Sequence, residues 1–236
     1  MAGETGLRRR RLYLVRHGHV SYFGAQGQPL DPRTVRLSAD GETQVAALRQ
    51  VLADVVVDRA VSSDYPRAQQ TLEMVLSQPP RAGAPEHLAA LREVKAGRLR
   101  EIPIAAYGAE VNGAYGDARL PDTRFLRGEP WDDFSDRVLG WFRAFLAEPN
   151  WQDAIVASHD AVNRILIGWL LSGDRTVIAS LEQDAACLNI VDVDCRADGT
   201  VDAAFVRLLN FTPYNITKKG DRLTVMDRIA QSMLAM

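Results

Sequence analysis

An uninterrupted apolar run at residues 12–15 ends on Arg16, His17 and Gly18. Four consecutive apolar residues between basic residues and a glycine are typical of a buried strand in a parallel sheet, because both faces of such a strand are covered. His17 is therefore predicted at the carboxyl end of a strand, which is the edge where open α/β sheets bind ligands. Gly18 would let a ligand approach the backbone closely. This feature predicts an α/β chain with a ligand site at His17.

A second apolar run, at residues 154–157, ends on Ser158, His159 and Asp160 and is followed by an apolar helical pattern. A single histidine at a strand end is more often a hydrogen-bonded structural residue than a catalytic one. Two of the four histidines of this chain, however, follow predicted strands. The repetition favours a shared site at one edge of the sheet.

Two further segments supply the charges that such a site could use. A short apolar stretch at residues 60–61 precedes Pro66, which is expected in the first turn of a helix and places Arg67 at the helix N-terminus. Free backbone N–H groups, the helix dipole and a guanidinium together favour an oxyanion. Farther along, Leu91-Arg92-Glu93 places a carboxylate after a short apolar stretch.

Taken in order, these segments resemble the motifs of the histidine phosphatase superfamily, which is also called phosphoglycerate mutase-like. The resemblance runs from about Arg11 to Val193, and each motif alone is weak, whereas four in order are specific. It implies a single three-layer α/β domain, with a mainly parallel sheet, helices on both faces and a small lid insertion. The matching motifs are Arg16-His17-Gly18, Ser62-Ser63-x-x-x-Arg67-Ala68-x-x-Thr71, Leu91-x-Glu93 and Ser158-His159.

The resemblance also implies roles for individual residues. His17 would attack phosphorus and form a phosphohistidine, with its second ring nitrogen held by a backbone carbonyl. Arg16, Arg67 and a cationic His159 would bind the three non-bridging oxygens, because phosphoryl transfer depends on positioning and charge stabilisation. Glu93 would protonate the leaving alcohol and then activate water. No metal ion or other cofactor is required by this scheme.

The chain departs from the family pattern after its first motif. His19, Val20 and Phe23 stand where many members have Glu, a hydroxyl residue and Asn. Two accessory phosphate contacts are absent from their usual positions, and Ser21 is the candidate to replace one of them. Asp160 replaces a glycine that often follows the second histidine. It is expected either to cap the following helix or to act on that histidine or the substrate.

Length and composition agree with one domain. A chain of 236 residues with 47% hydrophobic residues can bury one sizeable core, with residues 1–10, including the arginines from Arg8, as a flexible lead-in and 11–236 as the domain. A formal charge of −2 predicts no nucleic-acid or anionic-membrane partner. Without a hydrophobic leader or a membrane-spanning stretch, a cytoplasmic location is expected. The rarity of lysine among the 28 basic residues suggests a GC-rich bacterial genome.

Periodicity predicts the remaining elements. Ser38 is expected to cap a helix, and Val55–Val57 with Ala60 and Val61 is expected to form the next strand. Further predictions are an amphipathic helix over 131–146 and a late strand pair, 190–193 and 201–209, turning at Asp198-Gly199. The segment 97–130 fits no periodic pattern and is interpreted as a substrate lid, the alternative being a solvated surface excursion.

The sequence thus favours a phosphomonoesterase acting on a small phosphorylated metabolite. A phosphoglycerate mutase is less favoured, because the family's Glu-Arg-x-Tyr-Gly stretch is absent after Glu93. A metal-dependent hydrolase could be drawn around His17-Gly18-His19 with His159 and Asp160, although successive strand residues point to opposite faces. A non-catalytic phosphate-binding or scaffold protein is the third alternative. A homodimer is left open as the assembly.

Overall fold

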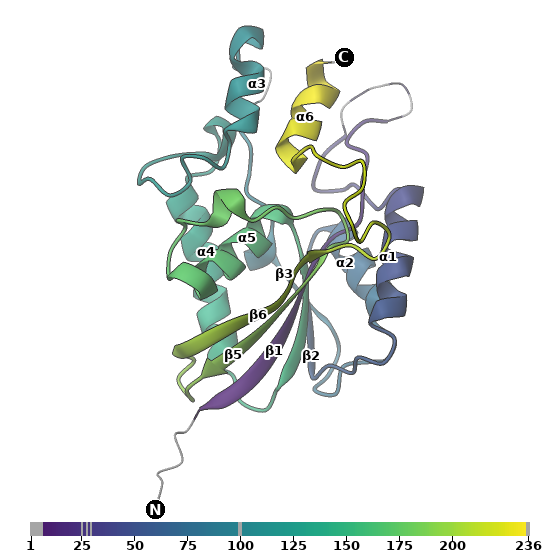
Figure 1. The fold of residues 1–236 in the computed structure, drawn as a ribbon, viewed down its shortest axis with the longest axis vertical. Helices are drawn as coiled ribbons and strands as arrows, with labels where there is room; N and C mark the ends of the chain where they lie inside the picture. The colour runs from purple at the N-terminus through teal and green to yellow at the C-terminus, as the bar shows by residue number, and fades with distance from the viewer. Residues whose placement is uncertain (1–6, 25, 27, 29, 99–100, 235–236) are drawn as a thin grey trace, which may run out of the picture.

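Residues 7–24, 26, 28, 30–98 and 101–234 are described by the computed structural model, and six strands among them form one mixed sheet (Figure 1). The spatial order is β3-β2-β4-β1-β5-β6. Strands β3, β2, β4 and β1 run parallel, whereas β5 pairs antiparallel with β1 and with β6. The prediction of a mainly parallel sheet is confirmed. The strands are β1 (Arg8–Arg16), β2 (Arg59–Ser63), β3 (Glu86–Leu88), β4 (Asp153–Ser158), β5 (Leu188–Cys195) and β6 (Val201–Phe211).

Helices cover both faces of this sheet, and β1 shows why. Leu12 and Leu14 join the core beneath α4 (Trp131–Ala147) and α5 (Asp160–Ser172), whereas Tyr13 and Val15 join the core beneath α1 (Ala39–Val51) and α2 (Pro66–Val75). Side chains alternate between the two faces of a strand, so a continuous apolar run requires cover on both sides. The three-layer α/β prediction is confirmed. Within the described residues, no helix is long and apolar enough to cross a membrane.

Several element boundaries follow local sequence chemistry. The Ser38 hydroxyl accepts a hydrogen bond from the Gly41 N–H at 3.1 Å and caps α1. Pro66 is the first residue of α2, where its missing N–H costs no hydrogen bond. The predicted helix at 131 and the late antiparallel strand pair are also present, with Gly199 at φ +85° in the connecting turn. These predictions are confirmed.

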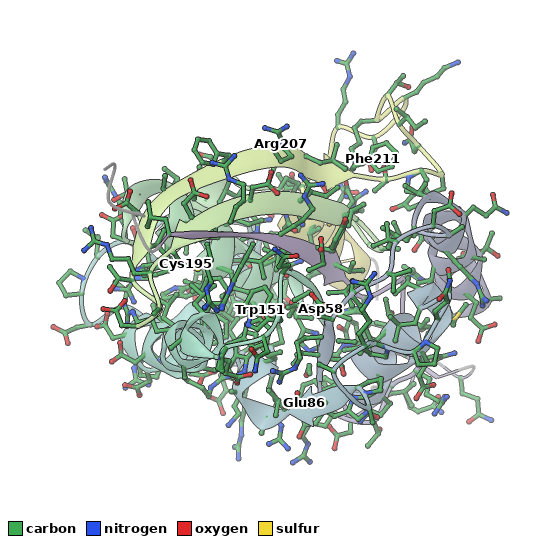
Figure 2. All side chains as sticks on the ribbon, turned by 90° about the horizontal axis from the view of Figure 1, so that it is seen from below. Asp58, Glu86, Trp151, Cys195, Arg207 and Phe211 are labelled. Atoms are coloured by element: carbon green, nitrogen blue, oxygen red, sulfur yellow. The ribbon has the colours of Figure 1, made fainter. Side chains whose placement is uncertain are left out.

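The amino end of β1 differs from the expectation. The strand begins at Arg8 rather than after residue 10, so the predicted lead-in is wrong for residues 8–10. Arg10 is 3% exposed, because its guanidinium donates to the carbonyls of Leu146 and Glu148 and lies 4.3 Å from the ring centroid of Trp151. Figure 2 shows this end of the sheet from below. An arginine with backbone acceptors and an aromatic neighbour can enter a core.

The second strand is also shorter than predicted. Val55–Val57 is a connection, and β2 begins only at Arg59. The Val55 N–H is bonded to the Leu52 carbonyl in a turn, and the Asp58 carboxylate accepts the N–H groups of Gln152 and Asp153 (Figure 2). Asp58 thus ties the start of β2 to the start of β4. The prediction that Val55–Val57 belongs to the strand is wrong, because a partly buried connection and a paired strand can have the same apolar sequence pattern.

The segment 97–130 contains regular structure that its sequence does not predict. It includes the helix α3 (Ile104–Asn112) and the 3-10 turn η3 (Phe125–Arg127), and Tyr115 and Phe125 reach the main core. A C-terminal helix, α6 (Val225–Leu234), was not predicted and packs against α3. Figure 1 shows both helices beyond the carboxyl ends of the parallel strands. The substrate lid stays a prediction.

Candidate active site

His17 follows β1 and is fixed on several sides. Its backbone N–H donates to the Ser158 carbonyl at 3.0 Å, and the residue is 4% exposed. Ring nitrogen Nδ1 lies 2.7 Å from the Gly18 carbonyl oxygen, while Nε2 faces the Arg67 Nε–H at 3.1 Å. Since a carbonyl can only accept, Nδ1 carries the proton and Nε2 carries the lone pair. The arrangement presents Nε2 as a nucleophile.

Gly18 is required here because the neighbouring helix is very close. A Cβ on Gly18 would lie 2.7 Å from the Gly41 carbonyl oxygen and 2.8 Å from a methyl group of Val45. Any larger residue would push α1 away from the end of β1. The glycine of the first motif therefore serves helix packing as well as the hydrogen bond from His17.

The protonation state of His17 suits a nucleophile. Burial, together with the positive charges of Arg67 and Arg16, holds the pKa of His17 well below its ordinary value of 6.5. The ring is therefore neutral near pH 7. A neutral imidazole keeps the electron pair that attack on phosphorus requires.

Three cationic or donating side chains lie around this ring. Arg67, near the N-terminus of α2, is 2% exposed and donates to the Pro32 carbonyl as well as to His17. Arg16 ends β1 and donates to the Gln183 carbonyl. His159 follows β4, with its ring centroid 5.1 Å from that of His17. The four residues that the sequence placed on three different elements are thus brought to one edge.

The cluster has unused hydrogen-bonding capacity. The Nε atom of Arg16 and both ring nitrogens of His159 are buried, with no hydrogen-bond partner among the described residues. Buried polar atoms are normally bonded, so such a group calls for an explanation, and an anion with several oxygens would supply the missing acceptors.

The charge of His159 depends on whether an anion is bound. Burial and the positive charge of Arg67 hold the pKa of His159 well below 6.5, so the ring of the free protein is neutral near pH 7. The cationic His159 was predicted for the site with phosphate bound, and it stays a prediction. A bound phosphate would favour the charged form by placing negative charge beside the ring.

Glu93 follows the 3-10 turn η1 (Ala89–Leu91) and reaches the start of α5. Its carboxylate accepts the Val94 N–H at 2.9 Å and the Ala161 N–H at 3.2 Å. Burial, followed by the negative charge of Asp160, raises the pKa of Glu93 to about 7. A carboxyl group with that pKa can both give and take a proton near neutral pH, as a general acid and base must.

Asp160 is the first residue of α5 and lies in a buried ion pair. The N-cap of α5 is His159, so the predicted capping role of Asp160 is wrong. One carboxylate oxygen of Asp160 accepts the Arg164 Nε–H at 2.6 Å, and the other accepts the Tyr115 hydroxyl at 3.0 Å. Asp160 is thus held in a buried ion pair, and its contact with substrate stays a prediction.

Ser21 and His19 lie outside this cluster. Ser21 is exposed, and its hydroxyl donates to the Phe23 carbonyl at 2.7 Å within its own loop. His19 is exposed and lies 2.8 Å from the Ser38 hydroxyl, whereas His17 points into the buried cluster. This separation weakens the metal-centre interpretation. Among the described residues, no three His, Cys, Asp or Glu side chains are placed to hold one metal ion. The phosphate contact of Ser21 stays a prediction.

Three residues of the site were not predicted. Tyr65 lies edge-on to His159, with ring centroids 5.5 Å apart, and beneath the Arg67 guanidinium at 4.8 Å. Tyr115 and Arg164 hold Asp160. The spacing of Asp160 and Arg164, one helical turn apart, could have suggested their ion pair. No sequence signal joins Tyr115 to them.

Comparisons with known proteins address the family and the fold of this chain. A sequence model described as the histidine phosphatase superfamily (branch 1) matches residues 12–201. A probable phosphoglycerate mutase of Salmonella paratyphi A is 27% identical over 167 residues, covering 68% of this chain and 74% of the relative. A broad-specificity phosphatase of Saccharomyces cerevisiae is 27% identical over 169 residues, covering 68% and 70%. The crystal structure of the alpha-ribazole phosphatase from Shigella flexneri superposes with a TM-score of 0.65 at 25% identity, covering 85% and 96%.

Proposed function

We propose, from the premise that this chain belongs to branch 1 of the histidine phosphatase superfamily, that it is a phosphomonoesterase. Its substrate is a small phosphorylated metabolite, hydrolysed through a phosphohistidine on His17 without a metal ion. Phosphatases among its relatives and structural neighbours support this reaction class. The observation that carries the proposal is the orientation of the His17 ring, with Nδ1 on the Gly18 carbonyl and Nε2 facing Arg67.

The first half of the reaction transfers the phosphoryl group to the protein. Nε2 of His17 forms a bond to phosphorus while the bond from phosphorus to the ester oxygen breaks. Arg16, Arg67 and His159 bind the non-bridging oxygens and stabilise their charge. Glu93 gives its proton to the departing alkoxide, which leaves as an alcohol.

The second half returns the protein to its starting state. Glu93, now a carboxylate, takes a proton from water as the water oxygen attacks phosphorus and the bond to Nε2 breaks. The products are inorganic phosphate and a neutral His17, and the proton is back on Glu93. One carboxyl group therefore serves both steps, which a pKa of about 7 permits.

The test is a panel of phosphomonoesters with release of inorganic phosphate as the readout. Wild-type protein is expected to hydrolyse at least one small ester, and His17→Ala, with an unchanged circular dichroism spectrum, is expected to release none. Substantial phosphate release by folded His17→Ala would overturn the assignment of the nucleophile. Failure of the wild-type protein on every ester would favour the non-catalytic alternative.

A mutase is the second candidate because one relative is a probable phosphoglycerate mutase. The residues after Glu93 disfavour a mutase, because Val94-Lys95-Ala96-Gly97 stands where mutases have Arg-x-Tyr-Gly. We expect phosphate release without priming by a bisphosphorylated sugar acid. Isomerisation of 3-phosphoglycerate that is faster than phosphate release would decide for the mutase.

A further inference from the structure

Asp160 lies in a network of charged groups that the proposed reaction does not use directly. Asp160 is 4% exposed and Arg164 is 1% exposed. The Arg164 guanidinium bonds Asp160 at 2.6 Å and Glu182 at 2.9 Å, and lies 4.2 Å from the ring centroid of Tyr115. With Tyr115 donating to its second oxygen, Asp160 has a charged or hydroxyl donor on each side. The ion pair therefore fixes a negative charge at the start of α5.

Glu93 reaches the same turn without a comparable partner. Its hydrogen-bond donors among the described residues are the backbone N–H groups of Val94 and Ala161, and Ala161 directly follows Asp160 in the chain. Among the charged groups that act on it, Asp160 opposes its ionisation and Arg16 favours it, and the titratable Tyr115 also faces it. When two carboxyl groups lie close together in a site that is partly shielded from water, the proton resides on the group that lacks a cationic partner. Here that group is Glu93.

We propose that Asp160 is a positioning residue for the catalytic proton, whose fixed negative charge keeps that proton on Glu93 until the leaving group takes it. The inference rests on the proposed function. It also assigns the acid, because the oxygens of Asp160 are occupied by Arg164 and Tyr115 and Asp160 is therefore not the donor. After transfer, two carboxylates lie at one helix turn. Their repulsion then favours the return of a proton from the attacking water to Glu93.

The pKa of Glu93, raised to about 7 by burial and then by Asp160, agrees with this arrangement. Tyr115 belongs to the segment 97–130, and Glu182 also accepts the N–H of Val225 at the start of α6. The position of Asp160 thus depends on both elements that lie beyond the strand ends.

The experiment compares pH profiles of kcat/KM for an alkyl phosphate in wild type, Asp160→Asn and Asp192→Asn. The Asp160→Asn substitution would keep a side-chain oxygen for Arg164 but remove the charge. Asp192 is a matched control, because it is also 4% exposed and also paired with an arginine, Arg11, at 2.7 Å, at the amino end of β1. Activity requires protonated Glu93, so it falls as the pH rises through the pKa of that group.

Asp160→Asn is expected to move this alkaline limb about one pH unit lower. The ratio of kcat/KM in the variant to that in wild type should therefore be about tenfold smaller at pH 8 than on the acidic side of the limb. Asp192→Asn is expected to leave the limb in place. In a Glu93→Gln background, Asp160→Asn is expected to leave the pH profile of kcat/KM unchanged. A merely structural role of Asp160 would not give this dependence on Glu93.

An unmoved limb in folded Asp160→Asn would overturn the inference while leaving the phosphatase assignment intact. Asp160→Ser serves as the second variant if the first does not fold. Loss of folding in both would assign Asp160 to structure and would also overturn it. A wild-type protein without phosphatase activity would overturn the proposed function and this inference together.

Discussion

The buried, neutral state of His17 makes a quantitative prediction about stability. In the unfolded chain a histidine takes up a proton near pH 6.5. In the fold, burial and the charges of Arg67 and Arg16 keep the pKa of His17 well below that value. Below about pH 6.5 the unfolded chain therefore binds more protons at this position than the folded chain does. The contribution of His17 to the free energy of unfolding is therefore fully present above about pH 6.5. It decreases as the pH falls from there toward the pKa of His17 in the folded protein.

The size of the effect follows from this linkage. For a histidine that stays neutral in the fold, lowering the pH from 7.5 to 5.5 removes about 1.4 kcal/mol of stability. His17→Gln removes the titrating group but keeps an amide that can donate to the Gly18 carbonyl and accept from Arg67. The variant is therefore expected to gain about 1.4 kcal/mol relative to wild type between pH 7.5 and 5.5. Its absolute stability at pH 7.5 does not enter the comparison.

Urea unfolding of both proteins at the two pH values measures this difference. Wild type alone is not sufficient, because the raised pKa of Glu93 stabilises the folded protein as the pH falls and opposes the histidine effect. The difference between the two proteins cancels that contribution. A relative stability that stays constant within about 0.3 kcal/mol would refute the neutral state of His17 and with it the protonation argument for the nucleophile.

Four further outcomes are expected. Rapid quenching without acid should trap phosphate on His17 during turnover, and its absence under burst conditions would count against a covalent intermediate. Glu93→Gln should slow the hydrolysis of alkyl phosphates about 10²- to 10⁴-fold. Phosphoenzyme formation from nitrophenyl phosphate, whose leaving group needs little protonation, should change much less. Equal slowing of phosphoenzyme formation from both esters would mean that Glu93 does not protonate the leaving group. Arg67→Met should weaken vanadate inhibition about 10- to 150-fold, the value of a charge-assisted hydrogen bond, whereas an unchanged inhibition constant would place the phosphate elsewhere. Activity should survive exhaustive chelation, and loss with recovery on adding zinc would favour the metal-dependent alternative.

The sequence predicted the central strands because their apolar runs admit few other interpretations. Residues 12–15 and 154–157 are buried on both faces, and each run ends on a histidine. Since parallel strands place their carboxyl ends at one edge, His17 and His159 were expected together, and their rings lie 5.1 Å apart. Arg67 followed from Pro66, which starts a helix at the same edge.

The errors arose where packing determines the structure more than local pattern. Val57 is 3% exposed and belongs to the core, yet it lies in a connection, because the apolar pattern reports burial and not strand pairing. The charge of Arg10 predicts exposure to solvent, but its guanidinium donates to two backbone carbonyls and lies over the ring of Trp151. The helices α3 and α6 pack against each other, and neither was predicted, although the residues of α6 have the spacing of an amphipathic helix.

The contacts that Tyr115 and Glu182 make with the Asp160–Arg164 pair are the part of the site that no local pattern could reveal. Tyr115 and Glu182 lie 45 and 18 residues from their partners Asp160 and Arg164, so only the folded chain brings these four side chains together. Their residue types are equally common on solvated surfaces. What distinguishes them is burial, which is a property of the fold.

Burial also explains how opposite protonation states coexist in one cluster. The same desolvation that lowers the pKa of His17 raises that of Glu93, because in each case it disfavours the charged form. Arg67 and Arg16 add to the first effect, and Asp160 adds to the second. Near pH 7 and below, His17, the proposed nucleophile, therefore has its lone pair, while Glu93, the proposed acid, has its proton, without any intervening base. It follows that kcat/KM for alkyl esters should decline about tenfold per pH unit above pH 7, and a profile that instead rises from pH 7 to 9 would mean that Glu93 acts only after it has lost its proton.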